Sequence, residues 1–200
     1  MGPGAGQIAG CVSGAWSPGI GDPSLFAWAI VTTYALAAVL AFLVALQRPF
    51  PADTGRREKV FWVLVSLAMA ALAVNKQLDL QSLLTTAGRC LAQVQGWYGE
   101  RRMVQRDLIL GLGLAAFVVL LVSAYGLRGT LGRTGLPLLG LIFVAGFVLI
   151  RAAGFHHVDV LLQDRFAATT VNWLFEVPGP VLVSVSAIWL LARRKRYPTS

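Results

Sequence analysis

The sequence predicts an all-α membrane protein, a bundle of five transmembrane helices with one amphipathic helix at the membrane interface. Of the 200 residues, 56% are hydrophobic and only 13% are charged, whereas soluble domains carry about a quarter charged residues. Several apolar runs are long enough to cross a hydrocarbon core of about 30 Å as helices. We therefore interpret the net charge of +8 as a signal of topology and headgroup contact, and we expect no nucleic-acid partner.

The predicted spans are bounded by proline, glycine and charged residues. Pro49 and Pro51 prevent the first span from continuing. The last span is interrupted by Pro178-Gly179-Pro180, which should kink the helix. Gly, Ser and Pro recur in residues 1–24, which predicts a flexible extension there, outside the cytoplasm. We expect residues 25–196 to form one helical domain. The five predicted spans are residues 25–46, 60–79, 108–127, 136–155 and 167–192.

Residues 80–98 differ from the spans because apolar and polar positions alternate at helical spacing. This pattern predicts an amphipathic helix that is too polar to cross the membrane. It would lie in the interface plane with Trp97 and Tyr98 at headgroup level. A helix packed on the outer surface of the bundle would need the same stripe. The stripe consists of Leu80, Leu83, Leu84, Ala87, Leu91, Val94 and Tyr98.

The distribution of arginine and lysine predicts the orientation. Residues 47–59, 128–135 and 193–200 hold ten of these cations, the opposite side holds seven, and the stretch 1–24 holds none. Because cytoplasmic loops carry the excess of positive charge, we expect the N-terminus outside and the C-terminus in the cytoplasm.

The two cysteines, Cys11 and Cys90, both fall on the predicted outer side. Their positions match no zinc-finger spacing. An oxidising compartment would permit a disulfide between them, although two unpaired thiols fit the sequence equally well.

Unusual polar residues cluster at three span ends, which the predicted topology brings to the outer end of the bundle. Ionisable residues in or near spans are costly and mark functional sites by default. A structural network, with Lys76 paired to Asp79 and Arg151 paired to Asp159 or Glu176, would also account for them. The candidate binding residues are Asn75, Lys76, Asp79, Arg151, His156, His157, Asp159, Asn172 and Glu176.

The adjacent histidines raise the hypothesis of a metal site. His156, His157 and Asp159 could hold an ion such as zinc, with Glu176 or Asp79 from another span completing the site. Haem fits less well, because two axial histidines usually come from two helices. A hydrogen-bonded interfacial histidine, sensitive to pH, is the simpler interpretation.

Four further motifs stand out: residues 75–81 (NKQLDLQ), 95–98 (QGWY) with Arg101-Arg102, 155–159 (FHHVD) and Asn172-Trp173. They resemble a family of small bacterial integral membrane proteins that are often labelled isopropylmalate isomerase. That label does not fit, because the enzyme of that name is a soluble iron–sulfur protein with cysteine ligands. The resemblance implies a multi-pass protein of the bacterial cytoplasmic (inner) membrane and transfers no activity. The arrangement is also similar, more weakly, to zinc hydrolases of the alkaline ceramidase and adiponectin-receptor type, whose HxxxH spacing is missing.

Three functions follow as hypotheses. The leading one is a non-enzymatic membrane protein whose outer pocket binds a lipid headgroup, another anionic group or a partner protein. In it, Arg151 and Lys76 supply the cations, which Asp79, Asp159 and Glu176 orient. The alternative is a metal-dependent hydrolase or transferase acting on lipid, with Glu176 or Asp79 as the base. The third is a small transporter, supported by the interrupted last span. The expected partners are membrane lipids, and a protein partner or a second copy of the chain.

Overall fold

Most of the described part of the chain is helical. The computed structural model describes residues 3–17, 19–20, 23–47, 50–153 and 176–193, and these residues contain no strand. A one-turn 3-10 helix, η1, spans Tyr98–Glu100. The α-helices are α1 (Pro3–Ala15), α2 (Leu25–Gln47), α3 (Gly55–Leu78), α4 (Leu80–Val94), α5 (Arg101–Gly126), α6 (Leu131–Ala153) and α9 (Pro178–Ala192).

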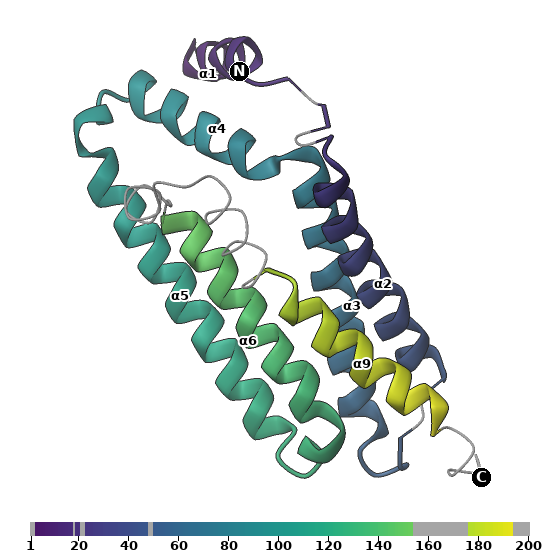
Figure 1. Cartoon of the computed structure of the whole chain (residues 1–200). Helices are drawn as coiled ribbons and strands as arrows, with labels where there is room; N and C mark the ends of the chain where they lie inside the picture. Colours follow the sequence, from purple (N-terminus) through teal and green to yellow (C-terminus); the bar gives the residue numbers. More distant parts are fainter. Residues whose placement is uncertain (1–2, 18, 21–22, 48–49, 154–175, 194–200) are drawn as a thin grey trace, which may run out of the picture.

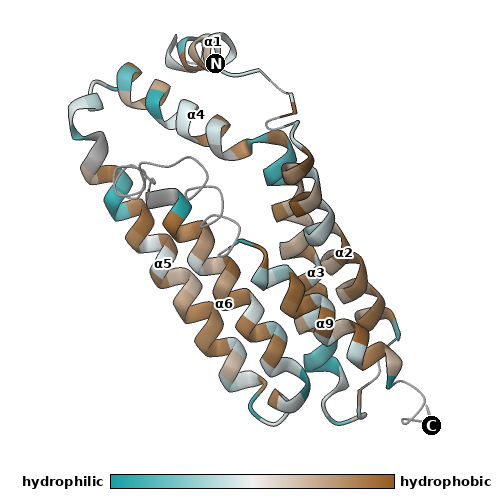
Figure 2. Ribbon diagram, viewed as in Figure 1, coloured by the Kyte–Doolittle hydropathy of each residue, from teal (hydrophilic) through white to brown (hydrophobic). Residues whose placement is uncertain are grey.

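Four of these helices are long and apolar enough to cross a membrane, which confirms the predicted membrane class. They are Leu25–Gln47, Gly55–Leu78, Met103–Gly126 and Leu131–Arg151. Figure 2 shows hydrophobic residues along their lengths and hydrophilic residues toward their ends. The predicted fifth span, 167–192, lies partly outside the described residues. Its described helix, α9, is apolar and 15 residues long.

The helices form two neighbouring groups joined by α9 (Figure 1). Helix α2 packs along α3, α9 contacts both α2 and α6, and α5 packs on α6. Small side chains on α2 allow close packing, because Ala37 and Ala41 are fully buried and Trp62 of α3 is buried as well. The hydroxyl of Ser66 on α3 donates to the carbonyl of Ala38 at 2.9 Å. Small residues and hydroxyl groups at such contacts are typical of helix association in membranes.

Glycines set the contact between α6 and α9. A Cβ added to Gly140 would lie 2.7 Å from the carbonyl oxygen of Gly179. A Cβ added to Gly179 would overlap Cγ2 of Val144 and lie 3.0 Å from the carbonyl oxygen of Gly140. The two backbones therefore approach as closely as they do because neither position carries a side chain.

Helix α4 lies across one end of the bundle (Figure 1), which we call the α4 end. The chain turns from α3 into α4 at Asp79, whose backbone is left-handed with φ 47° and ψ 45°. Aspartate tolerates this conformation better than most residues. The Asp79 N–H donates to the Asn75 carbonyl, and the Asp79 carbonyl accepts from the Ser82 N–H at 3.0 Å. The predicted boundary between span and amphipathic helix is thus placed to within one residue.

A buried ion pair ties α3 to α6 at the opposite end. Glu58 is fully buried, and its carboxylate accepts from Arg133 Nε at 3.0 Å and from Arg133 Nη2 at 2.7 Å. The hydroxyl of Thr54 donates to the same carboxylate at 2.7 Å. Sequence reasoning placed Arg133 in a turn and began the span at residue 136. The helix instead begins at Leu131, because this pairing holds its first turn against α3.

One further expectation was wrong. Residues Pro3–Ala15 form a helix rather than a flexible extension, since α1 packs on α4 and is joined to it by a disulfide. The predicted interruption at Pro178-Gly179-Pro180 agrees with the structure, because a bend at Val177 separates the helical residue Glu176 from α9, whose first turn holds Pro178 and Pro180. Proline is tolerated there, because the first N–H groups of a helix have no partner within it.

Candidate functional site

The α4 end of the bundle gathers charged side chains from three separate parts of the chain. Lys76 lies in the last turn of α3, Asp79 follows it, Arg151 lies in the last turn of α6, and Glu176 lies just before α9. All four line one pocket. The sequence prediction that these span ends converge is therefore met for these four residues.

Lys76 and Glu176 form a largely buried ion pair. Nζ of Lys76 donates to Oε2 of Glu176 at 3.1 Å, and the side chains are 16% and 2% exposed. The sequence predicts Asp79 as the ion-pair partner of Lys76. It also predicts that Lys76 and Arg151 supply the positive charges of the site. In the structure, Lys76 instead pairs with Glu176, which lies 100 residues away in the sequence. It fixes Glu176, and with it the start of α9, against the end of α3.

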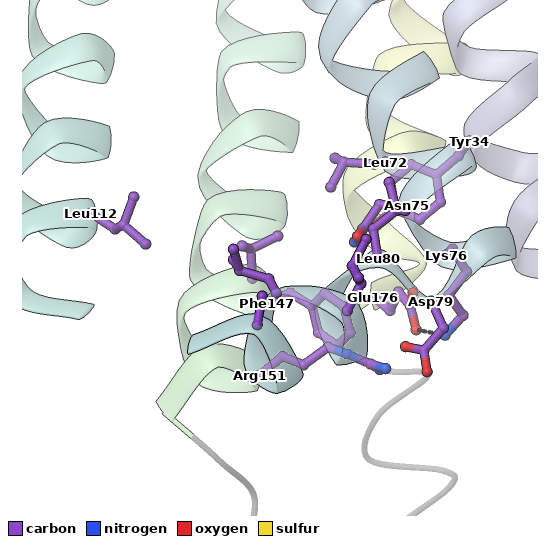
Figure 3. A pocket seen from close by; sticks show the side chains of 14 residues that line it. Tyr34, Leu72, Asn75, Lys76, Asp79, Leu80, Leu112, Phe147, Arg151 and Glu176 are labelled. Carbon is purple, nitrogen blue, oxygen red and sulfur yellow. Dashed lines mark hydrogen bonds and ion pairs between the residues drawn. The ribbon is translucent and has the colours of Figure 1, made fainter. Parts of the chain in front are cut away.

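The pocket has a volume of about 700 Å³, within the usual range for ligand sites. Figure 3 shows its charged groups at one end and Leu112 of α5 on the far side. Apolar side chains from α3, α4, α5 and α6 form most of the wall. The lining residues are Tyr34, Leu72, Asn75, Lys76, Asp79, Leu80, Leu83, Leu84, Ala87, Leu112, Phe147, Val148, Arg151 and Glu176.

Arg151 is held at the pocket by its place in the last turn of α6, where a cation also interacts favourably with the helix dipole. Its side chain extends toward the side of the pocket that carries Asp79 and the Lys76–Glu176 pair (Figure 3). The described charges of the pocket are therefore two cations and two carboxylates. This arrangement can accept an anionic group on the cations and a donor on the carboxylates.

The predicted metal ligands lie outside the described residues. This applies to His156, His157 and Asp159, and also to Asn172. Within the described part of the chain, no group of three His, Cys, Asp or Glu side chains is close enough to hold a metal ion. The zinc and haem hypotheses therefore remain sequence-based predictions.

The cysteines join α1 to α4. Cys11 and Cys90 form a disulfide with a Cα–Cα distance of 6.0 Å and a sequence separation of 79 residues. Cys90 is buried, and α4 lines the pocket with Leu80, Leu83 and Leu84. The bond therefore braces the helix that forms one wall of the pocket.

Sequence reasoning missed the apolar wall and Tyr34. The stripe on residues 80–98 was interpreted as the apolar face of a helix that lies in the membrane interface or packs on the outer face of the bundle. Its first four members line the pocket. Tyr34 is buried, with 2% exposure. The sequence feature that could have identified Tyr34 as a site residue is its position in the middle of the first span. A buried tyrosine hydroxyl usually needs a polar neighbour.

No family model matches the chain, and neither a curated protein nor a solved structure matches it.

Proposed function

We propose that this is a multi-pass membrane protein whose pocket at the α4 end binds a polar or anionic group, foremost the headgroup of a membrane lipid. The observation that supports it is the convergence of Lys76, Asp79, Arg151 and Glu176 on one pocket of about 700 Å³. Charged side chains in or near spans are costly and are usually retained where they bind something.

The chemistry of the cations favours a phosphate-bearing group. A guanidinium such as that of Arg151 matches the oxygens of a phosphate with two parallel donors, and a lysine adds a compact positive charge. Glu176 holds Lys76 at 3.1 Å, so the lysine is positioned before any ligand arrives. Preorganisation of this kind lowers the entropic cost of binding.

We also propose five spans, with the N-terminus and α4 outside and the C-terminus in the cytoplasm of a bacterial inner membrane. Support comes from the ten cations on one side against seven on the other, and from the Cys11–Cys90 disulfide, since disulfides persist in oxidising compartments. Helix α9 would form the inner part of the fifth span.

Cysteine labelling tests this orientation. In a Cys11→Ser/Cys90→Ser background, an impermeant maleimide should label Ser82→Cys at the α4 end in intact spheroplasts. It should label Asp53→Cys at the opposite end only after the membrane is broken. The reverse pattern would overturn the proposed orientation.

Headgroup binding is tested by native mass spectrometry of protein in a neutral detergent with added phosphatidylglycerol. Arg151→Ala should weaken binding roughly tenfold or more, the usual loss when a hydrogen bond to a charged group is removed. Arg151→Lys should lose less. Arg128→Ala is the matched control, because Arg128 lies at the opposite end and packs over Tyr125 at 4.6 Å. Equal lipid binding by Arg151→Ala and Arg128→Ala would contradict the proposal.

A further inference from the structure

The polarity of the pocket changes along its depth. Its charged residues lie at the α4 end, while Leu112 lies near the middle of α5, which begins at Arg101. Leu72 and Phe147 lie four residues before Lys76 and Arg151 on α3 and α6, about 6 Å from the charged end at a rise of about 1.5 Å per residue. A Cβ added to Gly113, the residue after Leu112, would lie 3.8 Å from the side chain of Leu149, so this part of α5 lies beside the last turns of α6. The pocket thus runs from its charged end about one helical turn into apolar side chains.

The apolar part of the pocket has few groups that can hydrogen-bond to water. The whole pocket, including its charged end, has a volume of about 700 Å³. Ordered water needs polar partners, and the apolar part of the wall offers few of them. Away from the charged side chains, most of the wall is made of leucine, alanine, phenylalanine and valine side chains, with Asn75 and Tyr34 as its polar members. Figure 3 shows Leu72 and Leu112 on this side of the pocket. A hydrocarbon group is the ligand that best matches this apolar wall.

The same pocket is open toward the side on which a bilayer would lie. Leu112 is 50% exposed, Leu84 69% and Val148 40%, although all three line the pocket. Helix α5 packs on α6 and η1, and none of the residues in its apolar window, Met103–Gly126, is fully buried. An acyl chain could therefore enter sideways from the membrane without passing the charged end.

From these observations we infer that the occupant is a phospholipid, with its phosphate at Arg151 and Lys76 and one acyl chain along Leu72, Leu84 and Leu112. This inference rests on the proposed function and narrows it, because a soluble anion such as glycerol 3-phosphate would use only the charged end. The order of headgroup and chain in the pocket is the order in one leaflet of a bilayer, so the lipid would keep its orientation on binding.

The test is a titration of n-alkyl phosphates of increasing chain length, followed by calorimetry on protein in a neutral maltoside detergent. Affinity should rise by about fourfold per methylene, the usual gain from burying one such group, until the apolar part is filled. Glycerol 3-phosphate should bind much more weakly than the longer alkyl phosphates.

Two variants separate binding in the pocket from partition into detergent. Leu112→Trp should lower the affinity for the longest alkyl phosphate by roughly tenfold, because it fills the space of two or more methylenes. Leu114→Trp is the matched control on the same helix, since Leu114 is 64% exposed and does not line the pocket. Ala87→Phe fills the pocket from α4 and serves as a second variant if Leu112→Trp fails to fold.

The outcomes are distinguishable. Chain-length dependence that Leu112→Trp or Ala87→Phe reduces and Leu114→Trp leaves intact supports the inference. If glycerol 3-phosphate binds as tightly as the alkyl phosphates and Arg151→Ala abolishes both, the inference fails and the proposed function stands. If Arg151→Ala changes neither, both fail. Equal chain-length dependence in all three tryptophan and phenylalanine variants means partition into detergent and overturns the inference.

Discussion

Lys76 and Glu176 are 100 residues apart in the sequence, and their side chains meet at 3.1 Å at the α4 end of the bundle. The pair joins the end of α3 to the residues just before α9 and lines the pocket that we propose as a binding site. Its burial gives each partner a large energetic dependence on the other, because a buried charge without its counterion is strongly destabilising.

Single removal of either partner should therefore destabilise the protein. We expect Lys76→Met or Glu176→Gln to cost about 3–5 kcal/mol, the usual penalty for breaking a buried pair. For a chain of this size, that lowers the apparent melting temperature by roughly 6–20 °C. The measurement is a thermal unfolding curve in detergent at a fixed scan rate. The double variant Lys76→Met/Glu176→Gln should recover much of the loss, and additive losses in the double variant would contradict the pairing.

The Glu58–Arg133 pair should show the same energetics without affecting ligand binding. Arg133→Met leaves the fully buried Glu58 without its cation and should lower the apparent melting temperature as strongly as Glu176→Gln. Arg133→Lys should lose less, because lysine keeps the charge but cannot replace both hydrogen bonds. Lipid binding by the folded fraction should be unchanged, since this pair lies at the opposite end. A loss of binding in Arg133→Lys would show that the two ends are coupled.

The α6–α9 contact should not tolerate a methyl group. Gly179→Ala would overlap Cγ2 of Val144, so we expect a loss of about 1–3 kcal/mol from overpacking. Gly146→Ala is the control on α6, because a Cβ there meets nothing within 4 Å. Thermal unfolding of the two variants checks the prediction, and equal melting temperatures would contradict the close approach of the backbones.

The Cys11–Cys90 disulfide should be present in protein purified from membranes without reductant. A maleimide-polymer reagent should shift the protein on a denaturing gel only after reduction. Cys11→Ser should release α1 from α4, which hydrogen exchange would detect as faster exchange in residues 3–15 and in the second half of α4. Labelling of both thiols before reduction would contradict the disulfide. Unchanged exchange in Cys11→Ser would show that packing alone holds α1.

The membrane class and the bounds of α2 could be predicted from the sequence because hydropathy is a local property. The predicted starts of α3 and α5, at residues 60 and 108, were five and seven residues later than Gly55 and Arg101. The turn at Asp79 was placed to within one residue, since the pattern changes there from apolar to amphipathic. The beginning of α6 was misplaced, at residue 136 instead of Leu131. The contact that holds its first turn, Arg133 on Glu58, joins residues 75 positions apart and leaves no local signal.

The candidate site was predictable in part for the same reason. Ionisable residues at span ends identified Lys76, Asp79, Arg151 and Glu176. The partner of Lys76 was not predictable, because Asp79 is closer in sequence and Glu176 is reached only through the packing of α9. The apolar wall of the pocket could not be predicted from the sequence either, because a leucine that lines a pocket and a leucine that faces lipid have the same hydropathy. Residues 154–175, with both histidines, lie outside the described part of the chain, so the metal hypothesis stays a prediction.

The most direct test of the central claim is photo-crosslinking with a phospholipid that carries a diazirine on its acyl chain, followed by mass-spectrometric mapping of the labelled residues. We predict labels on the pocket wall, at Leu72, Leu84 and Leu112, that decrease in Arg151→Ala. Labels spread evenly over the outward-facing residues Leu114 and Ile142, with no dependence on Arg151, would contradict a lipid-binding pocket at the α4 end.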